Sequence, residues 1–143
     1  MIIKALPHLS ANHDLHLAIN LSGQSFADQT LADFIAASFK AAHVEPCRVT
    51  FEITETAMIS NLPAARTMMH QLRGAGFRFA LDDFGAGFSS FNYLKELIPN
   101  YLKIDGSFIR DAENDRSKWI FVEMNERHRS SVENQEYSRI RRV

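Results

Sequence analysis

The sequence predicts an α/β fold in which about four parallel strands alternate with helices. Four short apolar runs have the length and composition of strands, namely residues 16–22, 48–54, 77–84 and 101–105. Segments with apolar residues at helical spacing separate these runs. Because a helix lies between each strand and the next, the strands should be parallel and joined by right-handed crossovers.

The intervening helices are the second observation behind this prediction. Within residues 27–44, apolar or small side chains recur on one helical face, namely Leu31, Phe34, Ile35, Ser38, Phe39 and Ala42. Asn61 and Pro63 are typical of a helix start. A further helix should follow the third strand near Phe88, and another should end just before Asn12.

Length and composition indicate one ordinary soluble domain. The chain has 143 residues, of which 45% are hydrophobic, and its net charge of -1 gives no reason to expect nucleic acid as a partner. No apolar run reaches the ~20 residues that span a bilayer, and the N-terminus lacks the layout of a signal peptide. The single cysteine, Cys47, excludes an internal disulfide. Together these features predict a cytoplasmic protein without a membrane segment.

The character of the chain changes near residue 123. Residues 123–143 are rich in Arg, Glu, Ser and Asn, with few apolar residues and no strand pattern. We therefore predict a folded domain over residues 1–122 and a divergent polar tail over residues 123–143. The tail should be poorly ordered or loosely helical. A solvated terminus is the simpler interpretation, and a basic binding arm is the alternative.

Polar or charged side chains stand at the end of every predicted strand. They are Asn20, Glu52, the pair Asp82 and Asp83, and Lys103 with Asp105. Parallel strands bring their carboxyl ends to one rim, which carries the active site in βα barrels. Carboxylate and amide oxygens are the ligands that hard cations such as Mg²⁺, Mn²⁺ and Ca²⁺ prefer. The four strand ends together therefore indicate a metal site.

The adjacent Asp82 and Asp83 need a specific explanation, because two neighbouring carboxylates repel each other. A bound cation would cancel the repulsion. Since neighbouring strand residues point to opposite faces, both can serve one centre only if the chain turns there. Gly85 and Gly87 allow such a turn. A turn with a helix cap is the alternative for such a pair.

Four motifs resemble, in order and spacing, those of the EAL domain family. They are INLSGQS, FEITET, LDDFGAGFSS and LKIDGSFI, and the resemblance runs from about residue 5 to about residue 111. It implies hydrolysis of the bacterial second messenger cyclic di-GMP to the linear dinucleotide pGpG. It also implies part of a (β/α)8 TIM-type barrel, with the first and last strands missing.

The resemblance implies a role for each rim residue. Asn20, Glu52 and Asp82 match metal ligands of the family, with Mg²⁺ or Mn²⁺ as the metal. Asp83 matches the aspartate of a second metal, and Lys103 matches the lysine that holds and polarises the attacking water. Two divalent ions can activate that water and stabilise charge on the phosphate oxygens.

Other positions correspond to loop support and substrate contact. Glu55 matches the glutamate that braces the loop after the third strand, and Gly85, Gly87 and Ser89 belong to that loop. Asp105 is the candidate contact to substrate. The family's usual Thr and Tyr are replaced by Ala86 and Phe88, which affects the hydrogen bonding of the loop more than metal binding.

Two expected family elements are not found in the sequence. The strand with the Glu-Ala-Leu motif should lie before residue 1, and an AEGVE-like strand should follow Asp111. QEYSRIRRV (135–143), read one nucleotide later with suitable codons, gives KNIAEFVE, so a frameshift is one hypothesis for the tail. We expect the isolated chain to be inactive and to self-associate through open barrel edges or through loop 84–90.

Several functions remain open at this point. The first is a truncated cyclic di-GMP phosphodiesterase domain. The alternative is a non-catalytic cyclic di-GMP receptor or a protein-interaction module. A non-functional gene remnant is a third possibility, and another metal-dependent phosphatase is less favoured by the four motifs.

Overall fold

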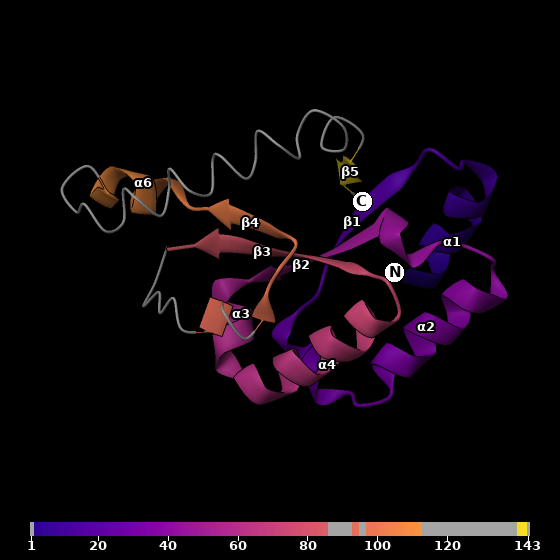
Figure 1. Cartoon of the computed structure of the whole chain (residues 1–143), viewed down its shortest axis with the longest axis horizontal. Helices are drawn as coiled ribbons and strands as arrows, with labels where there is room; N and C mark the ends of the chain where they lie inside the picture. The colour runs from indigo at the N-terminus through magenta and orange to yellow at the C-terminus, as the bar shows by residue number, and fades with distance from the viewer. Residues whose placement is uncertain (1, 86–92, 95–96, 113–139, 143) are drawn as a thin grey trace.

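A single parallel sheet organises the fold (Figure 1). The computed structural model describes residues 2–85, 93–94, 97–112 and 140–142. The strands are β1 (His16–Asn20), β2 (Val49–Thr54), β3 (Arg78–Phe84), β4 (Tyr101–Ile104) and β5 (Ile140–Arg142). They lie in the order β4-β3-β2-β1-β5, and every neighbouring pair is parallel. The four predicted strands and their parallel arrangement are therefore confirmed.

Helices lie between β1 and β2 and between β2 and β3, as the pattern predicts, and others precede β1 and follow β4. They are α1 (Ile2–Ala11), α2 (Leu31–Ala41), α3 (Glu55–Ser60), α4 (Leu62–Gly74) and α6 (Gly106–Ala112), with short 3-10 helices η1 (Gly23–Ala27) and η2 (Pro46–Arg48). In Figure 1, α2, α3 and α4 lie along one side of the sheet. Asn61 caps α4 by accepting a hydrogen bond from the Ala64 amide. None of the described helices is long and apolar enough to cross a membrane.

The neighbouring strands β2 and β3 are among the most buried parts of the fold. Five of the six residues of β2 are buried, because parallel strands are covered on both faces. An aromatic cluster lies beside them: the Phe77 ring is 4.9 Å from that of Phe39 and 5.3 Å from that of Phe51. This packing holds in place the strands whose carboxyl ends carry the predicted polar side chains.

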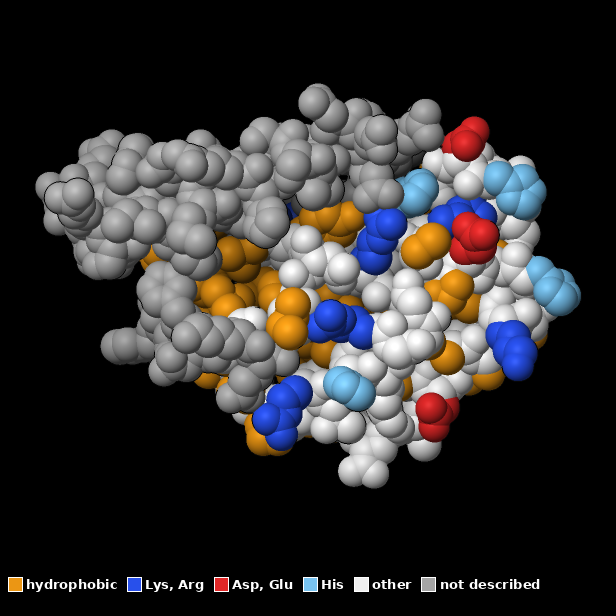
Figure 2. All heavy atoms as spheres, viewed as in Figure 1, with side chains coloured by type: hydrophobic (Ala, Val, Ile, Leu, Met, Phe, Trp, Pro, Cys, Tyr) orange, Lys and Arg blue, Asp and Glu red, His pale blue; other side chains and the backbone are white. Residues whose placement is uncertain are grey.

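The predicted face of α2 is correct only in part. Ile35 and Phe39 are fully buried, whereas Phe34 is 55% exposed, so Phe34 does not share the buried face of the helix. The helix expected near Phe88 falls on residues 86–92, which lie outside the described part of the chain. Figure 2 shows Lys, Arg and His side chains spread over the visible described surface among hydrophobic and other side chains.

The tail contributes a strand, contrary to the prediction that it has none. β5 pairs with β1 in parallel, with His16 opposite Ile140 and Ala18 opposite Arg142. Three residues are too few to produce a strand pattern in the sequence, and pairing with an open edge depends chiefly on the backbone. The β1 edge is therefore covered along these residues, while the division of the chain at 122/123 remains a prediction.

Candidate active site

The sheet register brings the polar strand ends together, as predicted for parallel strands. Asn20 at the end of β1 lies opposite Glu52 on β2. Thr54 at the end of β2 lies opposite Asp82 on β3. Neighbouring strands lie about 4.8 Å apart, so side chains from three strands can meet at this rim.

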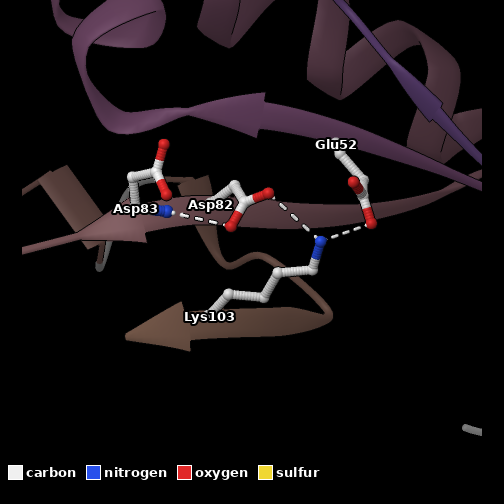
Figure 3. Close-up of polar contacts among 4 residues, drawn as sticks. All are labelled: Glu52, Asp82, Asp83 and Lys103. Atoms are coloured by element: carbon white, nitrogen blue, oxygen red, sulfur yellow. Dashed lines mark hydrogen bonds and ion pairs between the residues drawn. The ribbon is translucent and has the colours of Figure 1, made fainter. Parts of the chain in front are cut away.

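Lys103 joins two of these strand ends (Figure 3). Its Nζ lies 2.5 Å from Glu52 Oε1 and 3.2 Å from Asp82 Oδ2. The Glu52 side chain is only 7% exposed and that of Lys103 19%. Two carboxylates from adjacent strands thus converge on one cation, which in this structure is an ammonium group.

The surroundings of Lys103 keep it charged. Burial by itself would lower the pKa of the ammonium, but hydrogen bonds to Glu52 and Asp82 and their negative charges outweigh that effect. The pKa of Lys103 is therefore raised above its ordinary value of 10.5. At neutral pH the group can donate hydrogen bonds and stabilise negative charge, but it cannot accept a proton.

The adjacent aspartates diverge because β3 contains an irregularity between Leu81 and Phe84, where its register with β4 shifts. Asp83 has the left-handed φ of 56°, and its amide donates a 3.0 Å hydrogen bond to Asp82 Oδ1. In Figure 3 the Asp83 carboxylate points away from Lys103, whereas that of Asp82 points toward it. The chain has left-handed backbone at Gly85, as predicted for the turn, and also at Asp83, which was not predicted.

Glu55 lies just behind this turn, at the start of α3, and is 3% exposed. Its Oε2 accepts a 2.8 Å hydrogen bond from the Gly85 amide, and its Oε1 accepts one from the Tyr93 hydroxyl. Gly85 has φ of 96°, and a Cβ at this position would collide with the Phe108 ring. A glycine is therefore required where Glu55 holds the chain.

Asp105 caps the helix that follows it. Its Oδ1 accepts hydrogen bonds from the Ser107 amide at 2.7 Å and from the Ser107 hydroxyl at 2.5 Å. These hydrogen bonds lower the pKa of Asp105. Capping engages one of its oxygens, and its contact to substrate remains a prediction.

The donor set fits a divalent cation in part. Glu52 and Asp82 offer convergent carboxylate oxygens, which hard cations prefer. Across the described residues, however, no three His, Cys, Asp or Glu side chains group closely enough to hold a metal. The Asp83 carboxylate points away from Lys103, so a cation at Glu52 and Asp82 would need ligands beyond these two, and the amide oxygen of Asn20 is a candidate. Gly87 and Ser89 lie outside the described residues.

Tyr93 is the contact that the sequence did not reveal. It lies 38 positions from Glu55 in a segment whose apolar spacing indicates only a helix. A buried tyrosine hydroxyl nearly always needs a partner, but nothing in the sequence identifies that partner. Lys103, Glu52, Asp82 and Glu55 were all predicted as site residues, and the structure brings each of them to this rim.

Comparison with known proteins identifies the family. Residues 1–125 match the EAL domain, and the chain belongs to this family. Its parallel strands and helices form part of the TIM-type barrel that EAL domains share. Named homologues of the domain are cyclic di-GMP phosphodiesterases, and the family is metal-dependent.

Individual relatives agree with this assignment. The chain is 44% identical over 126 residues to cyclic di-GMP phosphodiesterase PdeB of Shewanella oneidensis, covering 85% of this chain and 15% of PdeB. It resembles the FimX EAL domain from Pseudomonas aeruginosa bound to c-di-GMP, with a TM-score of 0.70, 29% identity, and coverage of 85% of this chain and 49% of that one.

The manganese/cy-diGMP complex of BlrP1 from Klebsiella pneumoniae is a third relative. Its TM-score is 0.64 with 32% identity, and the match covers 76% of this chain and 28% of BlrP1. The chain thus spans about half, or less, of the proteins that it matches here.

Proposed function

We propose that this chain belongs to a cyclic di-GMP phosphodiesterase domain and that its polar rim is part of the hydrolytic centre. One observation carries the proposal: the Lys103 ammonium lies between the Glu52 and Asp82 carboxylates at the carboxyl ends of three neighbouring strands. In a TIM-type barrel this is the end at which catalytic side chains gather. The relatives named for cyclic di-GMP chemistry support the choice of substrate.

The charges at the rim suit phosphodiester hydrolysis. Water attacks the phosphorus atom, the bond from phosphorus to the ribose oxygen breaks, and negative charge grows on the phosphate oxygens. Lys103 is well placed to hold the attacking water and to stabilise that charge, because it donates hydrogen bonds and keeps its proton. It is not the general base, since its pKa lies far above neutral pH.

We further propose Mg²⁺ or Mn²⁺ as the cofactor. Glu52 and Asp82 would hold the first cation with Asn20, and Asp83 would belong to a second. When bound, such ions supply Lewis-acid stabilisation of the phosphate and a more acidic water. The oxygen donors of these four side chains are of the kind that Mg²⁺ and Mn²⁺ prefer. The manganese complex of BlrP1 is consistent with that choice of metal.

The test is hydrolysis of cyclic di-GMP by the purified chain with Mn²⁺ or Mg²⁺, comparing Glu52→Ala with Glu45→Ala. Glu45 is exposed and lies outside the rim, so its variant should keep the wild-type rate. Turnover that is abolished only in Glu52→Ala supports the proposal. Equal turnover in both variants contradicts it, and no turnover in folded wild-type protein supports the prediction that the isolated chain is inactive.

A non-catalytic cyclic di-GMP receptor or protein-interaction module is the second candidate. The observation in its favour is that the Lys103 ammonium forms ion pairs with both Glu52 and Asp82 and so offsets part of their negative charge. A receptor of this kind should bind cyclic di-GMP equally well in EDTA. A phosphodiesterase site should bind it more tightly with a divalent cation, so a titration in both conditions separates the two candidates.

The last part of the proposal is that copies of this chain associate with one another in the cytoplasm. β5 covers part of the β1 edge, while β4 lies at the other end of the described sheet and its four residues are only half-buried. We propose that copies meet through the β4 edge or through loop 84–90. Sedimentation velocity should reveal oligomers, and a monodisperse monomer across micromolar concentrations contradicts this part.

A further inference from the structure

Glu55 ties together three segments that are distant in the sequence. It begins α3, accepts a hydrogen bond from the Gly85 amide at the end of β3, and accepts another from the hydroxyl of Tyr93. Glu55 is 3% exposed and Tyr93 is 7% exposed. Both donors are neutral groups, and each occupies a different oxygen of the carboxylate. The direction of the carboxylate is therefore set by two contacts at once.

The Gly85 amide follows immediately on the two rim aspartates. Asp83 and Gly85 both have left-handed backbone conformations, with φ of 56° and 96°. A non-glycine residue in this region is uncommon and persists where the surroundings hold it. Glu55 supplies such a hold at Gly85, two residues after Asp83 and three after Asp82.

We propose that Tyr93 is a positioning residue for the rim carboxylates, an inference that rests on the proposed function. Its hydroxyl fixes Oε1 of Glu55, so that Oε2 stays directed at the Gly85 amide. Without the hydroxyl the carboxylate loses one of the contacts that set its direction, and the turn carrying Asp82 and Asp83 is held less firmly. Ligands that are less ordered bind a cation more weakly, because binding must first order them.

Tyr93→Phe tests this role, since it removes one oxygen and keeps the ring. The control is Tyr101→Phe, which removes the hydroxyl that accepts a 3.1 Å hydrogen bond from Arg78 at the opposite end of β3. Amide exchange at Gly85, followed by NMR in metal-free protein, reports on the turn. Mn²⁺ binding, followed by the EPR signal of free Mn²⁺, reports on the ligands without requiring catalysis.

The expected result has two parts. Tyr93→Phe should speed exchange at Gly85 by about tenfold or more while β2 amides keep their rates, and should weaken Mn²⁺ binding by about tenfold. Tyr101→Phe should change neither. Unchanged exchange at Gly85 overturns the proposal, and so does faster exchange with unchanged Mn²⁺ affinity, because Tyr93 would then have no effect on the ligands.

Wild-type protein alone provides a second test if the variant does not fold. Coupling between two sites is reciprocal, so Mn²⁺ must slow exchange at Gly85 if the turn and the ligands are linked. Exchange that is indifferent to bound Mn²⁺ overturns the proposal. If wild-type protein binds no Mn²⁺, the proposed function is overturned instead. Faster amide exchange at Gly85 in Tyr93→Phe would then still show that Tyr93 stabilises the turn.

Discussion

Glu52 and Glu55 are three residues apart and both buried, yet the protein stabilises them in different ways. Glu52 faces the ammonium group of Lys103, whereas Glu55 faces the neutral donors of Tyr93 and Gly85. An ammonium ion can be exchanged for another cation, because charge is the main requirement. Donors fixed in the backbone and in a packed ring cannot be exchanged in this way. One carboxylate is thus suited to bind a cation and the other to hold the chain.

The largest effect on stability is expected for Glu55→Ala. The change leaves the Gly85 amide and the Tyr93 hydroxyl without this acceptor and opens a small cavity. The free energy of unfolding should fall by about 3 kcal/mol, measured by urea denaturation. Mn²⁺ should not close the gap in stability to wild type, because no cation can replace an acceptor. Glu45→Ala, at an exposed position, should remain within about 0.5 kcal/mol of wild type.

Lys103→Met should produce the opposite response to metal. The change keeps an apolar stem but leaves Glu52 buried without its cation, so the free energy of unfolding should fall by about 2 kcal/mol. Mn²⁺ should restore much of this loss, because it binds the folded state where the ammonium stood. Thermal melts with and without Mn²⁺ measure both effects.

Two results would break the comparison. If Lys103→Met is not rescued by Mn²⁺, then Glu52 is not a cation ligand in this chain. If Glu55→Ala is rescued as well, the two carboxylates do not differ in the way proposed. Lys40→Met removes an exposed lysine on α2 and should leave both melting curves close to wild type.

The pH dependence of stability sharpens the role of Lys103. Its pKa is higher in the folded state than the ordinary 10.5, so its contribution is fully present below pH 10.5. The contribution is lost as the pH rises through the higher folded value. The difference in unfolding free energy between wild type and Lys103→Met should therefore stay constant up to about pH 10 and narrow above it. A difference that narrows already near pH 8 would contradict the raised pKa.

The rim could be predicted from the sequence because it depends on topology alone. Alternating strands and helices imply parallel strands, and parallel strands must bring Glu52, Asp82 and Lys103 to the same edge. The finer geometry could not be predicted in this way. The irregularity at Asp83 depends on how β3 and β4 pair, and the contact of Tyr93 with Glu55 depends on packing between segments 38 residues apart.

The smallest effects concern two helix ends far from either carboxylate. The second residue after the end of α2 is His43, with φ of 52°, and the second residue after the end of α4 is Gly76, with φ of 97°. In both cases the next amide, that of Val44 or Phe77, donates back to the last helical turn, as in a Schellman motif. Only one of the two ends therefore has the residue that this conformation favours.

Introducing a glycine at His43 and removing the glycine at Gly76 should change the free energy of unfolding in opposite directions. His43→Gly should raise the free energy of unfolding by about 0.5–1 kcal/mol, and Gly76→Ala should lower it by about 1 kcal/mol. The alanine Cβ would meet Pro46 at an ordinary 3.6 Å, so the backbone conformation alone accounts for the loss. The difference in unfolding free energy between each variant and wild type should be the same with and without Mn²⁺, because both variants keep the proposed metal site. If either difference changes when Mn²⁺ is added, the metal affects more of the fold than the Glu52 side of the rim, and the contrast between Glu52 and Glu55 is contradicted.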